Sequence, residues 1–524
     1  MPAPATAQPA AQERPPHQAS QPRQAPMSAI DWLSKSVAMP AGRTGRPTGK
    51  ADVATGAAPA AISTLPLDAP RIDAAGVLPT SVTGLPRGLW GATPTATLAD
   101  MIARMQVSAL PAVQDLLYTL LMAELDPPFD ATGDGQLFLA RVDKLLALGA
   151  LDQAGALLEI AGTDTPQAFR RWFDVALLTG DEARACAAIR TRPDIAPTFP
   201  ARVFCLARSG DWTAAALSLR TGEALGFVSQ AEADLMTHFL DPTLLEQDGP
   251  LPPPQPITPL TWRLLEAIGE PIPTNTLPVA FAQADLGPTA GWKAQIEAAE
   301  RLARLGAIPG NQLWGLYTRA APSASGGVWE RVRALRAFER ALVSTDPPAA
   351  AAATLADALA AVWPLMQAAD LEVPFAELYG TRLQGKGLTG DAARLAFEIG
   401  LLSADYEEIA AAHTPTTPRE AFLRGLARGD TGGVILPDTM ARAIARGLAA
   451  RALPPDQALP PDMTDLVTSD RLGEALLRAM DALARGAAGD PAAVPDAIAL
   501  LQRVGLQDTL RRSALQLMLL DRRG

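Results

Sequence analysis

The sequence predicts an all-α protein: an irregular array of helical hairpins in two lobes, preceded by a disordered N-terminal tail. Aromatic residues make up only 5% of the 524 residues and β-branched runs are scarce, which favours helices over an extended sheet. Within 136–220, the glycines Gly149, Gly180 and Gly210 follow one another at intervals of 31 and 30 residues. Each lies between an apolar helical run and a second, Ala-rich run, which is typical of helix–turn–helix repeats.

The turns between these helices share one chemistry. Glycine ends a helix because it adopts a left-handed conformation without a side-chain clash, and aspartate then accepts hydrogen bonds from the free N–H groups of the next helix. This pair occurs at Gly180-Asp181 and Gly210-Asp211. It returns without fixed spacing at Gly390-Asp391, Gly429-Asp430 and Gly489-Asp490, which predicts an irregular array.

In hairpin length and in its small residues at the helix crossings, the stretch 136–220 resembles tetratricopeptide (TPR)-like repeats. The resemblance implies an α-solenoid, a scaffold that many unrelated functions use. The Trp, Tyr and Pro positions of that family are not all present, so the resemblance carries over no binding residue and implies no specific function. An ordinary irregular helical domain with Gly-Asp turns is the alternative.

Composition divides the chain into four parts. Residues 1–95 are rich in Pro, Ala, Gly, Thr and Gln and lack sustained periodicity, which predicts a disordered tail. A helical-repeat lobe is expected at 96–240 and a second helical lobe at 260–524. Between them, 241–259 contains seven prolines and is expected to be a linker.

Charge and hydropathy exclude some classes of partner. The whole chain carries −11 and the tail carries +3, from eight Lys/Arg against five Asp/Glu, so the remainder carries −14. An acidic body argues against a nucleic-acid surface. The best candidate for a membrane span, 349–369, contains Asp357 and Pro364 and is mainly Ala, so we expect a buried helix and no membrane span.

The N-terminus and the two cysteines bear on location. Ala5-Thr6-Ala7 fits the small-x-small end of a secretory signal, a possible remnant at 1–7, although the preceding basic and apolar regions are missing. Antiparallel packing of the two successive helices that carry Cys186 and Cys205 would place both at about the same height, so a disulfide is predicted if the protein is exported. Two buried free thiols are the alternative. A periplasmic or cell-envelope location is predicted, with the cytoplasm as the alternative.

The residues suited to catalysis or metal binding are few. The three histidines are His17, His238 and His413, and no zinc-spaced Cys pair, H-E-x-x-H, phosphate-binding loop or G-x-S-x-G elbow is present. Asp241 follows His238 at helical spacing, but a histidine at a helix end beside a loop aspartate is far commoner than a catalytic pair. The loop from Asp130 to Asp134 lacks the ligands that calcium needs. No catalytic, metal-binding or cofactor-binding residue is predicted, and the sequence leans against an enzyme.

One apolar segment interrupts the tail. In 29–37, the residues Ile30, Leu33 and Val37 step by three and four, so a helical turn places them on one face, and Trp32 adds a large anchor beside it. Nine residues are too few for a stable isolated helix, so the segment is expected to order only on binding. Docking on another protein and docking on the protein's own body both remain open.

These observations favour a non-catalytic helical scaffold or adaptor that binds another protein, of unspecified identity, in the bacterial cell envelope. An all-α enzyme acting on envelope polysaccharide is one alternative, since soluble lytic transglycosylases use an Ala-rich helical superstructure. Their separate catalytic segment has no counterpart here. A cytoplasmic assembly factor is the other alternative.

Overall fold

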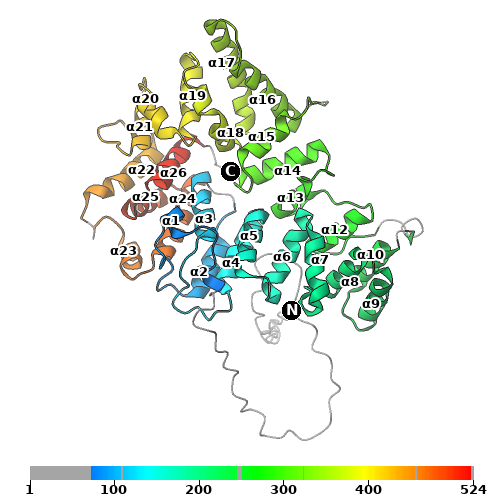
Figure 1. Cartoon of the computed structure of the whole chain (residues 1–524). Helices are drawn as coiled ribbons and strands as arrows, with labels where there is room; N and C mark the ends of the chain where they lie inside the picture. Colours follow the sequence, from blue (N-terminus) through cyan, green and yellow to red (C-terminus); the bar gives the residue numbers. More distant parts are fainter. Residues whose placement is uncertain are drawn as a thin grey trace, which may run out of the picture.

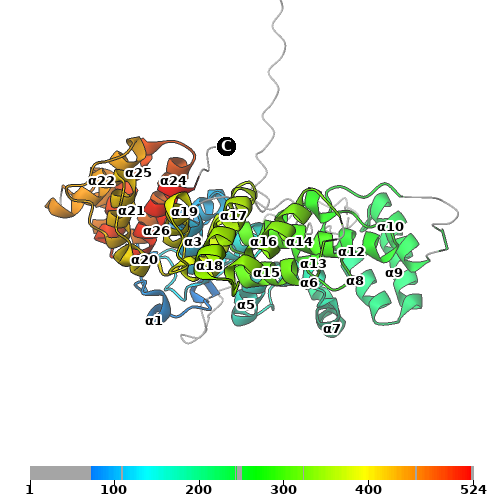
Figure 2. The ribbon, with the colours of Figure 1, turned by 90° about the horizontal axis from the view of Figure 1, so that it is seen from above.

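The computed structural model describes residues 72–107, 110–241, 243–244, 251–322, 324–454 and 457–520. Within these ranges the chain forms 25 α-helices, together with several short 3-10 helices, and no β-strand. The all-α prediction is therefore confirmed. Seen from above, the body is elongated, with α9 (Trp212–Ala224) at one end and α22 (Thr439–Ala449) at the other (Figure 2). The predicted docking residues Ile30, Trp32, Leu33 and Val37 lie outside the described residues.

The first helices form the centre of the molecule (Figure 1). They are η1 (Ile72–Ala74), α1 (Thr80–Thr83), α2 (Thr95–Arg104), α3 (Pro111–Met122), α4 (Gln136–Ala147) and α5 (Leu151–Ala161). Helix α4 packs against α2, α3 and α5. Gly149, between α4 and α5, has φ 77°, so it adopts the left-handed conformation that the sequence predicts for a helix end.

The folded body begins earlier than the sequence predicts. The tail was expected to extend to residue 95, yet Leu89 and Trp90 are buried, and the Asp73 carboxylate accepts a hydrogen bond of 2.9 Å from the Phe138 N–H. Residues 75–79 and 84–94 run as turns and extended chain against the helices. Such segments have no hydrophobic period, so their burial leaves no helical signal in the sequence.

The next five helices follow one another along the chain and in space. They are α6 (Pro166–Thr179), α7 (Glu182–Thr191), α8 (Phe199–Arg208), α9 and α10 (Gln230–Leu240), and each packs against its successor. Gly180 and Gly210 have φ values of 82° and 90°, as predicted. The Asp211 side chain caps α9 by accepting the Ala214 N–H at 3.0 Å, whereas the Asp181 side chain makes no cap bond and lies 3.9 Å from Arg184 instead.

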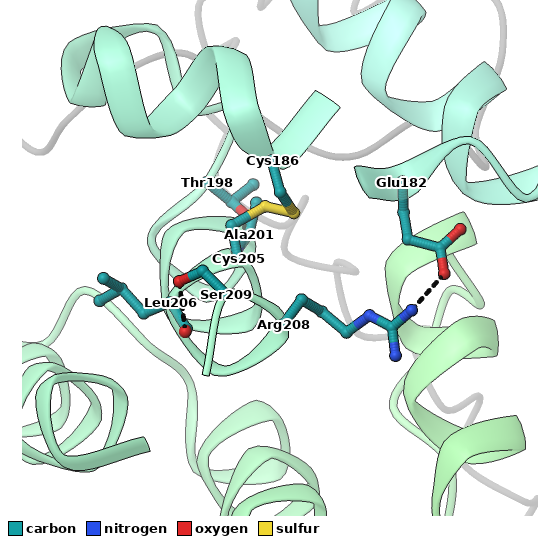
Figure 3. Close-up of a disulfide and its surroundings, with 8 residues drawn as sticks. All are labelled: Glu182, Cys186, Thr198, Ala201, Cys205, Leu206, Arg208 and Ser209. Atoms are coloured by element: carbon teal, nitrogen blue, oxygen red, sulfur yellow. Dashed lines mark hydrogen bonds and ion pairs between the residues drawn. A yellow bond between two sulfur atoms is a disulfide. The ribbon is translucent and has the colours of Figure 1, made fainter. Parts of the chain in front are cut away.

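Helices α6 to α10 form an arm of the molecule. Within this arm a disulfide joins α7 to α8 (Figure 3). Cys186 in α7 and Cys205 in α8 have Cα atoms 4.9 Å apart. Next to them, Arg208 donates to Glu182 at 2.8 Å, so one ion pair crosses the same helix interface. The structure therefore places the two cysteines as antiparallel packing of successive helices requires.

The middle of the chain continues from this arm without a gap in packing. The helices are α12 (Pro259–Ala267), η3 (Thr274–Thr276), η4 (Val279–Phe281), α13 (Ala282–Asp285), α14 (Trp292–Arg304), α15 (Gly310–Thr318), α16 (Val328–Leu342), α17 (Pro348–Gln367) and α18 (Glu372–Tyr379). Helix α12 packs against α6 and α10, and Arg263 in α12 donates to the Leu177 carbonyl in α6. Helices on the two sides of the predicted linker are thus in direct contact.

Helix α17 differs from its predicted environment. Among the described helices it is the one whose length and composition suit a membrane span. Only 28% of an 18-residue apolar stretch of this helix is buried. Leu355, Leu359 and Met366 supply part of its buried face. The sequence predicted a buried helix, but the Ala-rich turns at 349–354 lie at the surface, where small methyl side chains cost little in water.

The last helices bring the chain back to its start. They are α19 (Gly390–Leu401), α20 (Tyr406–Ala412), α21 (Pro418–Arg428), α22, α23 (Pro461–Thr468), α24 (Leu472–Ala487), η7 (Pro491–Ala493), α25 (Val494–Arg503) and α26 (Gln507–Leu519). Helices α24 and α26 both pack against α3, and the Gln516 side-chain oxygen accepts the Ala112 N–H at 2.9 Å. On another side of α3, the Tyr118 hydroxyl donates to the Leu305 carbonyl at 2.9 Å. Helix α3 therefore holds the final helix and the middle of the chain together.

We predict that Gln516→Ala lowers the free energy of unfolding by about 1–3 kcal/mol, because it leaves the buried Ala112 N–H without its acceptor. Urea unfolding of the full-length protein measures the change. Gln507→Ala, an exposed substitution of the same type on the same helix, is expected to change it by less than about 0.5 kcal/mol. Equal stabilities of the two variants would contradict the prediction.

We predict that the exported protein, denatured without reductant, contains no titratable thiol. Reduction is expected to release both thiols and to lower the free energy of unfolding by about 3 kcal/mol, as the loop-entropy relation gives for two cysteines 19 residues apart. The variant Cys186→Ala/Cys205→Ala serves as the control and should not respond to reductant. Two free thiols in the denatured, unreduced protein would rule the disulfide out.

Candidate protein-binding groove

The histidine and aspartate that share helical spacing do not form a pair. His238 is buried in α10, and its Nδ1 atom lies 2.8 Å from the Asp234 carbonyl oxygen one turn earlier. The Asp241 carboxylate instead accepts hydrogen bonds from the Thr243 hydroxyl at 2.7 Å and the Thr243 N–H at 3.2 Å. The two residues therefore serve a helix and a turn, and the arrangement is not that of a catalytic dyad.

His413 joins a polar cluster between α20 and α21. Its Nε2 atom lies 2.9 Å from Glu420, and its ring stacks on Phe397 with centroids 3.6 Å apart. Glu420 also accepts the Thr416 N–H at 2.8 Å. Burial opposes ionisation of Glu420, but the hydrogen bonds from Thr416 and His413 outweigh it and lower the pKa of this carboxyl. The cluster closes a helix junction and leaves no group positioned for a substrate.

The acidic loop before α4 also serves the fold. Asp130 accepts the Thr95 N–H at 2.8 Å and the Thr95 hydroxyl at 2.6 Å, so it caps the start of α2. Asp134 accepts the Gln136 N–H at 3.2 Å. Across the described part of the chain, no three His, Cys, Asp or Glu side chains come together in a way that would hold a metal ion.

One concave feature of the described residues is a groove of about 650 Å³, which we call the α2–α24 groove. Helix α2 forms one wall, and α23, α24, η7 and the start of α25 form the rest. Its apolar floor consists of Met101, Met105, Met463, Leu477, Ala482 and Ala497. Its rim carries Arg104, Arg478, Arg485, Asp462, Asp481, Asp490 and Asp496. A volume of this size is typical of sites that bind a ligand or a few side chains of a partner.

The floor of the groove combines flexible and small side chains. Met105 and Met463 are buried to within 8% and 7% exposure, and Met101 is half-buried beside them. Methionine is unbranched and polarisable, so it adapts its shape to different apolar partners. Ala482 and Ala497 leave room between these side chains because they end at Cβ. The floor is therefore suited to apolar side chains of varied shape.

The rim carries more negative than positive charge. Its arginines already have partners: Arg104 lies 2.9 Å from Asp100, Arg478 lies 2.7 Å from Glu474, and Arg485 lies 3.3 Å from Asp481.

Two rim carboxylates remain uncompensated. Within the described ranges, neither Asp462 nor Asp496 has an ion-pair partner. Both side chains are exposed. The groove therefore presents an apolar floor with free acidic groups at its edge, a combination that favours an amphipathic and basic ligand.

A buried lysine fixes the end of the α2 wall. The Lys144 ammonium in α4 donates to the Ala103 carbonyl at 2.9 Å and the Met105 carbonyl at 2.7 Å, which are free carbonyls at the end of α2. Burial lowers the pKa of Lys144 to about 8. The opposite wall is tied in by the backbone, since the Gly473 N–H donates to the Leu89 carbonyl at 2.8 Å. Both walls are thus fixed to neighbouring segments by hydrogen bonds.

A second cavity, of about 580 Å³, lies among α12, η3, α13 and α14. Its charged side chains serve the neighbouring loops: Arg301 donates to the Thr274 and Leu277 carbonyls, both at 2.8 Å, and Asp285 accepts from the Thr274 hydroxyl. The α2–α24 groove is the better candidate because it retains charged groups for a ligand.

Comparisons with protein-family models, curated proteins and solved structures give no match to this chain. The sequence predicted helices at both walls of the groove but did not place them together, because residues such as Met105 and Met463 are more than three hundred positions apart. The one local signal was the spacing of Met101 and Met105, which puts two methionines on one helical face.

We predict that the Lys144 ammonium makes stability depend on pH between about 8 and 10.5. In this window the unfolded chain, with a lysine pKa of 10.5, holds a proton that the folded protein has released. The free energy of unfolding therefore rises with pH across this window, by a total of about 3 kcal/mol. This gain is complete above pH 10.5 and is lost as the pH falls through 8.

Urea unfolding of wild type and Lys144→Met across this range measures the effect. The free energy of unfolding of the wild type should rise relative to the variant as pH increases. Parallel curves would contradict the prediction. The hydrogen bonds that the variant loses add only a constant offset, so they do not imitate the slope.

Proposed function

We propose that this protein is a non-catalytic helical scaffold or adaptor of the bacterial cell envelope, and that its α2–α24 groove binds a helical segment of a partner protein. The observation that carries the proposal is the pairing of an apolar methionine floor with the free carboxylates of Asp462 and Asp496. Amphipathic helices dock in such grooves with their apolar face down. The fitting partner segment therefore has apolar residues at helical spacing and Lys or Arg beside them.

The arrangement of helices supports a scaffold role. From α4 to α10 each helix packs against its successor, and glycines with positive φ separate the hairpins. This arrangement supports the proposal of a TPR-like α-solenoid, in which stacked hairpins bury a continuous core and leave extended surfaces for binding. We include this solenoid in the proposal for the α4–α10 part of the chain.

Two features support the envelope as the location. The disulfide between α7 and α8 is of a kind that persists in oxidising compartments. The Ala5-Thr6-Ala7 sequence matches the end of a secretory signal.

We predict that reversing the free rim charges, in Asp462→Lys/Asp496→Lys, lowers partner recovery from envelope extracts about tenfold. Two favourable ion pairs of up to about 1 kcal/mol each would become repulsive, and about 1.4 kcal/mol corresponds to a factor of ten. Affinity capture on the full-length protein, with quantitative mass spectrometry, measures the change.

The matched control is Asp194→Lys/Glu223→Lys, which changes the net charge equally at exposed sites on the α7–α9 arm. This variant should recover the partner as the wild type does. Equal recovery by the two charge-reversed variants would refute the groove as the binding site.

A further inference from the structure

The N-terminal segment 29–50 has the chemistry that the groove favours. Ile30, Leu33 and Val37 share a helical face, and Trp32 lies beside it. The basic residues Lys35, Arg43, Arg46 and Lys50 lie within or shortly after this face, against the single acid Asp31. Four cations and one anion give the segment a charge of +3, opposite in sign to the excess charge of the groove rim.

We infer that residues 29–50 bind in the α2–α24 groove of their own chain. Ile30, Leu33 and Val37 contact the methionine floor, and the basic residues that follow lie at Asp462 and Asp496. The inference rests on the proposed function, since the partner uses the same groove, and it makes the segment an intramolecular competitor of that partner.

The position at which the chain enters the body allows this contact. Ile72 lies over Gly135 at the start of α4, where an added Cβ would come within 2.9 Å of the Ile72 side chain. Lys144, nine residues and about 14 Å further along α4, bonds to the groove wall at Ala103 and Met105. The 21 residues from 51 to 71 span up to about 70 Å when extended, so the tether is long enough.

The sizes of segment and groove also match. A nine-residue helix over 29–37 would be about 14 Å long, and the ten-residue wall helix α2 is about 15 Å long. A tether of this length gives an effective concentration on the order of 1 mM. A weak intrinsic affinity is therefore enough to fill the groove, although the free segment is too short for a stable helix.

Hydrogen–deuterium exchange on the full-length protein, without any partner, tests the inference. Amides in 30–37 are expected to exchange at least about tenfold more slowly than in the free synthetic peptide 29–50. The protection should disappear in Trp32→Ala/Leu33→Ala and in Asp462→Lys/Asp496→Lys. It should persist in Asp194→Lys/Glu223→Lys.

Three outcomes would overturn the inference. The first is exchange of 30–37 at the free-peptide rate in the wild type. The second is protection that survives Asp462→Lys/Asp496→Lys, which would place the segment elsewhere on the body. The third is protection that is lost on dilution, which would show that a second copy supplies the segment.

Partner capture separates this inference from the proposed function. If both hold, Trp32→Ala/Leu33→Ala captures severalfold more partner than the wild type, because the groove is no longer occupied. Protected amides with no partner captured by either protein would uphold the inference and refute the proposed function. Rim-dependent capture with unprotected amides would do the reverse. Capture that falls in Trp32→Ala/Leu33→Ala would assign the segment to an external protein and overturn the inference.

Discussion

The hydrogen bond from the Ala112 N–H to Gln516 joins residues 404 positions apart and closes the chain on itself. Helix α3 begins at Pro111, and Leu110 before it provides no side-chain cap, so the N–H groups of its first turn need acceptors from elsewhere. The last helix supplies one of them. Because α3 also contacts α4, α24 and the loop after α14, the position of the whole centre depends on the return of α26.

Buried charges in α4 anchor helix ends and the irregular chain before α2. Arg141 is fully buried and donates to the Leu121 and Ala123 carbonyls at 2.8 Å and to the Ala75 carbonyl at 2.9 Å. Lys144 does the same for the end of α2. A guanidinium supplies five donors in a planar fork, so one side chain satisfies several carbonyls that neither a helix nor a sheet would pair. The irregular chain before α2 is thereby tied to α4, and one groove wall with it.

The sequence predicts the parts of this fold that local pattern records. Helical periodicity located the hairpins, and the glycines at 149, 180 and 210 predicted turns that the structure contains. Local pattern carries no information about which distant elements meet, so the sequence could not predict that Met105 and Met463 line one groove. It also overlooks buried extended chain, as at Leu89 and Trp90. Arg141 and Lys144 would be placed at the surface by residue type alone, since charged residues are almost never fully buried unless they are paired.

Closure of α26 on α3 also orders events in time. A ribosome adds roughly 5–20 residues per second, so roughly 20 to 80 seconds separate the synthesis of Ala112 from that of Gln516. During that interval the start of α3 lacks its acceptor and its neighbouring helix, and the centre of the molecule cannot reach its final packing. The body therefore completes folding only after translation.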